Sequence, residues 1–208
     1  MLDPDLAYLL GALRDGSVYY ERASRNYVTV FYQKHKTWLE QSIATRLIRL
    51  FGVNCKVDEY KPGHWRARVY SKKLYTIWQT RFGYPKEGLT QLNWNTPKQI
   101  MKADPIVKSA YIRGFFDAEG DVSPTTSSSP YIGISQKNRQ VLEELKQILE
   151  ELGISTGGIH TIDSISNTLR FVVASKEAIS KFITIINSEH PEKKNSLNRI
   201  RTYTGQQT

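Results

Sequence analysis

The sequence has a single cysteine, Cys55, among its 208 residues. One thiol cannot form an internal disulfide, and it excludes a zinc site built from several cysteines. Long apolar runs are missing as well, since no stretch approaches the roughly 20 apolar residues that a membrane-spanning helix needs. The opening residues, MLDPDLAYLLGAL, lack the basic flank and the cleavage site of a secretory signal. We therefore expect an intracellular, cytoplasmic protein that does not associate with membranes.

Acidic residues are also in deficit. The chain has 20 acidic and 29 basic residues, a net charge of +9 and a pI near 9.5. This balance points to a polyanionic partner, with nucleic acid the leading candidate, because no basic amphipathic helix or lipidation motif indicates a membrane surface. Histidine is scarce, and the four histidines are scattered without ligand spacing, so we expect surface or strand roles for them: His35, His64, His160 and His190.

The chain repeats itself. Residues 7–18 read AYLLGALRDGSV and residues 110–122 read AYIRGFFDAEGDV, so that Asp15 matches Glu119 once a gap of one residue is allowed. Three further blocks match in the same order, starting at residues 27, 47 and 65 in the first copy and at 131, 147 and 168 in the second. Four matching blocks in the same order indicate a duplicated structural unit.

Each copy predicts the element order α, β, β, α, β, β, α. Apolar residues recur at helical spacing in the motifs, and residues 27–33 and 130–135 alternate as strands do. Amphipathic helices at 37–51 and 138–152 should end at Gly52 and Gly153. The fold class is therefore α+β, with duplicated αββαββα units and two antiparallel sheets that form a saddle around a pseudo-twofold axis. We place the N-terminal half at residues 1–82, the linker at 83–104 and the C-terminal half at 105–208.

Two small residues stand four apart on one face of each motif helix: Ala7 and Gly11 in the first, Ala110 and Gly114 in the second. Such faces let two helices pack backbone to backbone. That packing would bring Asp15 and Glu119 together at the negative ends of two helix dipoles, where a divalent cation relieves their repulsion. Carboxylate oxygens with open water positions suit Mg²⁺, and Mn²⁺ or Ca²⁺ could occupy the same sites. A metal held there can activate water for phosphodiester hydrolysis.

An acid before a glycine often does no more than end a helix, so neither residue would be informative alone. Their recurrence at matched points of a duplicated chain favours catalysis.

The two motifs, LLGALRDGS and IRGFFDAEGD, resemble the paired LAGLIDADG motifs of homing endonucleases. The other matched blocks follow that family's order over nearly the whole chain, and the resemblance is greatest to the archaeal, intron-encoded monomeric type. It implies a prokaryotic, site-specific endonuclease that promotes intron mobility. It also implies that a monomer, without an obligate protein partner, binds double-stranded DNA and cuts both strands at a long asymmetric site, leaving short 3′ overhangs.

The resemblance implies a set of catalytic residues as well. In that family the last acid of each motif binds metal between the scissile phosphates, which corresponds to Asp15 and Glu119. A glutamine that ends the second strand and a lysine beyond the fourth lie around the active centre, and the matching positions hold Gln33, Gln136, Lys72 and Lys176. A lysine that opens a helix after serine is, however, also a common surface residue.

The first motif departs from the family pattern. Its glycine and acid, Gly11 and Asp15, are one residue closer than Gly114 and Glu119, and Arg14 stands where a small or acidic residue is expected. Either the helix end is rewound locally, or the close contact between the helices uses other residues.

Strand alternation predicts a DNA-binding face. If Val57 and Val69 point inward toward the helices, the residues that alternate with them should point outward. In the first half these are Lys56, Asp58, Tyr60, Arg66, Arg68 and Tyr70, and the matching positions of the second half hold His160 and Arg170. Lys34 and Lys137, which follow the matched glutamines, and two tips, one with Arg22 and Arg25 and one at 123–130, would extend the contact. A basic β-ribbon fits the DNA major groove, where arginine can bind guanine.

A non-cleaving nucleic-acid binder of the same fold, either an RNA maturase or an inactive nuclease, is the main alternative function. The presence of both acids favours the endonuclease. A histidine-based nuclease is a weak third possibility.

Overall fold

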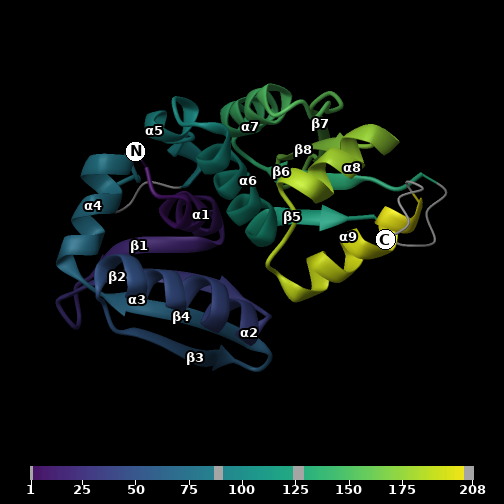
Figure 1. Cartoon of the computed structure of the whole chain (residues 1–208). Coiled ribbons are helices and arrows are strands. Elements are labelled where there is room, and N and C mark those ends of the chain that lie inside the picture. The colour runs from purple at the N-terminus through teal and green to yellow at the C-terminus, as the bar shows by residue number, and fades with distance from the viewer. Residues whose placement is uncertain (1, 87–90, 124–128, 204–208) are drawn as a thin grey trace.

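The computed structural model describes residues 2–86, 91–123 and 129–203, and it contains two similar halves joined through a central helix pair (Figure 1). The N-terminal half comprises α1 Pro4–Ala12, η1 Leu13–Asp15, β1 Gly16–Glu21, β2 Asn26–Gln33, α2 Lys36–Trp38, η2 Leu39–Ala44, α3 Thr45–Phe51, β3 Cys55–Lys61, β4 His64–Tyr70 and α4 Lys72–Phe82. The segment between the halves contains η3 Gln91–Asn93 and α5 Lys98–Met101. The C-terminal half comprises α6 Pro105–Glu119, β5 Gly120–Val122, β6 Ile132–Gln136, α7 Arg139–Glu151, β7 His160–Asp163, β8 Thr168–Val173, α8 Lys176–Ile185 and α9 Pro191–Tyr203. The predicted α+β class and element order are confirmed.

Each half contains a four-stranded antiparallel sheet, ordered β1-β2-β4-β3 and β5-β6-β8-β7. The registers agree between the halves, because Gly16 pairs with Phe31 as Gly120 pairs with Ile134. Strands β1 and β5, which directly follow the motif helices, are edge strands and lie nearest the central helix pair in Figure 1. Helices pack on one face of each sheet, with α4 on β2 and α7 on β6 and β8. The opposite face is available for a partner.

The motif helices α1 and α6 pack against each other at the centre of the molecule (Figure 1). A Cβ atom on Gly11 would lie 2.2 Å from the carbonyl oxygen of Tyr111, and one on Gly114 would lie 2.0 Å from that of Tyr8. Contacts this short leave room for glycine alone, so the backbones touch as the small-residue spacing predicts. Ala7 and Ala110 are also buried in this core.

The first motif is rewound, which decides between the two alternatives left open by its spacing. Helix α1 ends at Ala12, and the residues Leu13–Asp15 form a 3₁₀ turn, whereas α6 remains α-helical through Glu119. Three residues of 3₁₀ helix rise about 6 Å, the same as four residues of α-helix, so the missing residue does not shift Asp15 along the helix axis. Arg14 is 3% exposed, and its Nη1 donates to the carbonyl oxygen of Trp94 at 2.5 Å.

Several local features differ from a regular reading of the sequence. The helix expected at 37–51 is interrupted by a π-helical stretch, Leu39–Ala44. Gly52 and Gly153 have positive φ angles of 61° and 74° and end the amphipathic helices as expected. The prediction of a surface or strand role is wrong for His190, which is 3% exposed and directly precedes α9.

No helix among residues 2–86, 91–123 and 129–203 is long and apolar enough to cross a bilayer.

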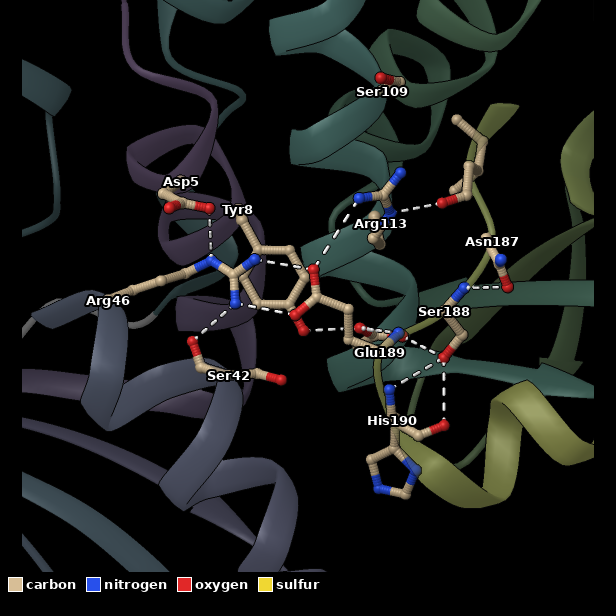
Figure 2. Close-up of polar contacts among 12 residues, drawn as sticks. Asp5, Tyr8, Ser42, Arg46, Ser109, Arg113, Asn187, Ser188, Glu189 and His190 are labelled. Atoms are coloured by element: carbon tan, nitrogen blue, oxygen red, sulfur yellow. Dashed lines mark hydrogen bonds and ion pairs between the residues drawn. The ribbon is translucent and has the colours of Figure 1, made fainter. Parts of the chain in front are cut away.

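Polar contacts tie the two halves together beside the motif helices (Figure 2). Arg46 of α3 donates to both carboxylate oxygens of Glu189, at 2.8 and 2.7 Å, and to Asp5 at 2.8 Å. In the buried layer beneath, the Tyr8 hydroxyl donates to Asp117 at 2.6 Å. Because Arg46 and Glu189 belong to different halves, these contacts fix the halves relative to each other.

Candidate active site and nucleic-acid interface

The two motif acids converge at the paired ends of α6 and η1. Asp15 is the last residue of η1, Glu119 is the last residue of α6, and each is followed by the glycine that starts an edge strand. Asp15 lies close enough to Glu119 for its negative charge to raise the pKa of that carboxyl group. The predicted pairing of one acid from each half is thus present in the fold.

Burial dominates the electrostatics of this pair. It raises the pKa of Asp15 to about 6, which nearby Lys193 partly offsets. Burial, and next the charge of Asp15, raise the pKa of Glu119 to about 7, while Lys193 and Arg14 oppose the rise. Two partly buried carboxylates with elevated pKa values are costly to ionise, and a bound cation would lower that cost. Within the described residues, no cluster of three or more His, Cys, Asp or Glu side chains is arranged to hold a metal ion.

Lys193 of α9 is a cation of this site that sequence reasoning missed. Its Nζ donates to the carbonyl oxygens of Phe116 and Asp117 at 2.8 and 2.7 Å, in the last turn of α6. Burial lowers the pKa of Lys193 to about 8, although four nearby carboxylates, those of Asp117, Glu119, Asp15 and Asp121, oppose that shift. The only sequence signal was a pair of lysines at the start of the last predicted helix, which says nothing about what lies beside it.

The matched glutamines have the same local geometry in both halves. The Oε1 atoms of Gln33 and Gln136 each accept a hydrogen bond from the backbone N–H of the following lysine, at 2.8 Å in both cases. They lie at the ends of β2 and β6. The following residues, Lys34 and Lys137, are exposed.

The lysines selected by resemblance, Lys72 and Lys176, occupy the first positions of α4 and α8. Both are exposed, and the Nζ of Lys72 lies 5.6 Å from the centre of the Tyr27 ring. In the described part of the chain, neither is among the charges that shift the pKa of Asp15 or Glu119, whereas Lys193 shifts both. Lys193 therefore lies beside both acids.

The open face of the N-terminal sheet is basic. Cross-strand pairs place Arg66 beside Asp58 and Arg68 beside Lys56. Arg66 donates to both oxygens of Asp58 at 3.1 Å, and this hydrogen bonding lowers the pKa of the carboxyl group. Tyr60 and Tyr70 are exposed on the same ribbon, as the alternation predicts. Arg22 and Arg25 lie exposed in the turn between β1 and β2.

The C-terminal sheet is less basic at the matching places. His160 pairs with Arg170 across β7 and β8, and His160 is exposed. Arg170 donates to Asp121 at 2.6 Å and to Ser135 at 2.9 Å. Of the predicted tip at 123–130, residues 124–128 lie outside the described residues. The two open faces therefore carry different side chains.

Comparisons with known proteins agree with this geometry. A family profile described as a LAGLIDADG-like domain matches residues 107–187. The homing endonuclease I-ApeI of Aeropyrum pernix is 35% identical over 196 residues, which span 94% of this chain and 86% of that protein. The chain belongs to the LAGLIDADG homing endonuclease family. The resemblance of the two motifs to that family is thereby confirmed.

Solved structures of the homing endonuclease I-DmoI share the fold of this LAGLIDADG protein. The crystal structure of I-DmoI with DNA and Mn matches with a TM-score of 0.66 and 25% identity, over 88% of this chain and 96% of that one. The structure of I-DmoI with DNA and Ca matches with a TM-score of 0.70 and 23% identity, over 94% and 97%. Both motif acids here come from one chain, so a monomer contains a whole pair.

Proposed function

We propose that this protein is a site-specific homing endonuclease that hydrolyses both strands of double-stranded DNA at a long, asymmetric site. The observation that carries the proposal is the convergence of Asp15 and Glu119, one from each half, at adjoining helix ends. The similarity to I-ApeI over nearly the whole chain supports the same activity, and the I-DmoI complexes with DNA support the substrate. Homing, the spread of a mobile intron, is the role that this activity would serve.

Asp15 and Glu119 would hold a divalent cation, for which Mg²⁺ is our candidate. The chemistry of the donors fits, because both groups are carboxylates, whose oxygens Mg²⁺ prefers as ligands. The Mn and Ca of the I-DmoI complexes support a divalent ion without selecting one. When bound, such an ion supplies an activated water and charge stabilisation for phosphodiester hydrolysis.

The protein's own side chains have separate tasks. Lys193, held by two carbonyl oxygens at the end of α6, places a fixed positive charge beside the acids, where it can offset charge on the scissile phosphate. In Gln33 and Gln136 the Oε1 atom already accepts a hydrogen bond from a backbone N–H, which leaves each amide N–H₂ to donate to water or phosphate. We propose that the open sheet faces recognise the bases of the DNA site, mainly through Arg66 and Arg68.

Cleavage of the intron-free allele of the host gene tests the function. Purified protein should linearise a plasmid carrying that allele with Mg²⁺ and leave it intact with a chelator. Asp15→Asn and Glu119→Gln should abolish cleavage and leave the DNA mobility shift largely intact, since neither acid is among the side chains of the open sheet faces that we assign to DNA binding. Glu143→Gln, on the exposed surface of α7, is a matched control that should cut normally. Wild-type protein that shifts this DNA without cutting either strand would instead indicate the non-cleaving binder.

A further inference from the structure

Two equivalent arginines are anchored in opposite directions. Arg66 on β4 and Arg170 on β8 occupy matching positions in the two sheets. The Nε and Nη2 of Arg66 donate at 3.1 Å to Asp58, which lies on the outermost strand β3. The Nη2 of Arg170 donates at 2.6 Å to Asp121, which lies on the innermost strand β5. One guanidinium is therefore drawn toward the outer edge of its sheet and the other toward the active centre.

The intervening strand explains the difference. Tyr32 pairs with Arg66, so β2, the strand on the inner side of that arginine, carries a bulky side chain there, whose ring contacts that of Tyr60 on β3 with centroids 5.3 Å apart. The matching residue on β6 is Ser135, whose Oγ accepts from the Nε of Arg170 at 2.9 Å. Its neighbour Gly133 is also small. A Cβ there would lie 2.7 Å from the Oδ1 of Asp121, so glycine makes room for the carboxylate. The small residues of β6 thus leave space for the Arg170 side chain to extend across that strand to Asp121.

The acid that receives this arginine has no counterpart in the first half. Asp121 pairs with Gly133, and the matching pair in the N-terminal sheet is Ser17 with Val30. Asp121 lies two residues beyond Glu119 on the strand that leaves the motif helix. The Glu119 side of the centre therefore has an anchored guanidinium, and the Asp15 side has a serine in place of its anchor.

We propose that Asp121 is a positioning residue that holds Arg170 toward the scissile phosphate on the Glu119 side, so that the two DNA strands are cut at unequal rates. The inference rests on the proposed endonuclease function. Arginine has five N–H donors, and the two contacts to Asp121 and Ser135 leave others to bind a phosphate. A guanidinium fixed along one edge also loses less freedom when DNA binds. Arg170 would then contact the phosphate backbone of the DNA at the cleavage position, in place of the base contact expected from the sequence.

The test follows both nicks on a supercoiled plasmid that carries the site. Asp121→Ser, which copies the residue of the first half, should slow one strand about tenfold, because the guanidinium is no longer held in place. The ratio of the two nicking rates should then change by the same factor, and a duplex labelled on each strand should identify the strand that slows. Arg170→Met should slow the same strand, and Asp121→Glu should restore part of the rate.

Asp58→Ser is the matched control, because it removes the anchor of the equivalent arginine on the other sheet. It should weaken DNA binding and leave the ratio of the two nicking rates unchanged at saturating protein. Equal slowing of both strands by Asp121→Ser and Arg170→Met, or the same change in the ratio with Asp58→Ser, would overturn the proposal. Wild-type protein that cuts neither strand would reject the endonuclease itself, whereas a wild type that cuts and an Asp121→Ser variant with an unchanged ratio would reject this inference alone.

Discussion

The two halves are most alike where they meet and most different where they face outward. At the helix pair, Gly11 and Gly114 each lie against the backbone of the other helix, and the edge strands have the same register. On the open faces, Asp58 of the first half is matched by His160 and Arg68 by Val172. Convergence of the acids requires symmetry, whereas a DNA site without symmetry requires two different faces. The duplicated chain has kept the symmetric helix pair, and its two open faces have become different.

The ends of the two motifs differ in sequence and agree in position. The first motif is one residue shorter, and a 3₁₀ turn over Leu13–Asp15 restores the rise of about 6 Å. Arg14, turned toward Trp94 of the segment between the halves, is buried as part of that turn. What the fold conserves between its halves is the place of the carboxylate, and the spacing of residues adapts to it.

The largest expected effect comes from breaking the symmetric contact. Gly114→Ala puts a methyl group 2.0 Å from the carbonyl oxygen of Tyr8, which neither backbone can avoid without separating the helices. We expect a loss of more than about 3 kcal/mol in the free energy of unfolding, measured by thermal or urea denaturation. Gly158→Ala is the control, since a Cβ there meets nothing within 4 Å, and it should change stability by less than about 0.5 kcal/mol. A Gly114→Ala protein as stable as wild type would refute the close approach.

The open faces should differ in binding energy. Arg66→Ala removes a candidate guanine contact and leaves the carboxylate of Asp58 without its bidentate partner, facing the DNA. We expect the Kd for the target duplex, measured by fluorescence polarisation, to rise about 30-fold, equivalent to about 2 kcal/mol. His160→Ala, at the matching ribbon of the second half, should change it less than about threefold. Equal losses would show that both faces contribute alike, against the asymmetry of their charges.

The sequence alone was enough to select the two acids, because the two copies of the motif can be aligned directly. Asp15 and Glu119 could be paired from matched motifs, and the small residues indicated how their helices meet. Lys193 could not be found this way, because its place beside the acids depends on how α9 packs against the end of α6. Resemblance selected Lys72 and Lys176, which are the first residues of α4 and α8.

Side-chain partners across strands were likewise beyond sequence reasoning. Alternation placed Arg66 and Arg170 on equivalent positions of the open faces, and the registers agree with that. It gave no direction for either guanidinium, since that depends on which neighbour is small and which strand carries the acid. The burial of His190 is another case, because its ring packs against Trp38 and His35 of the other half.

The contact between the halves beside α1 should have an intermediate effect. Glu189→Ala removes the bidentate partner of Arg46 and leaves the guanidinium with Asp5 and a carbonyl oxygen (Figure 2). Because both side chains retain some solvent contact, we expect a loss of about 1.5 kcal/mol in unfolding free energy. Glu192→Ala, an exposed acid of α9, is the control. A fall in stability no larger than that of the control would mean that the ion pair does not hold the halves together.

The smallest expected effect separates the stability of the acid pair from its function. The pKa of Glu119 is about 7 in the folded protein against a usual value of 4.5, so the folded state binds this proton more tightly than the unfolded state does. The resulting stability is complete below the unfolded value and is lost as the pH rises through about 7. Without divalent metal, Glu119→Gln should therefore be more stable than wild type at pH 8, by an amount on the order of 1 kcal/mol, and the gain should vanish near pH 4.

Melting temperatures of both proteins across this pH range, with a chelator present, would measure that difference. Adding Mg²⁺ at pH 8 should then raise the melting temperature of wild type more than that of Glu119→Gln, because only wild type retains both carboxylates to bind the ion. A gain that is independent of pH would mean that the glutamine stabilises by packing, and the electrostatic cost assigned to the acid pair would be wrong. A metal effect equal in the two proteins would place the divalent ion away from Glu119.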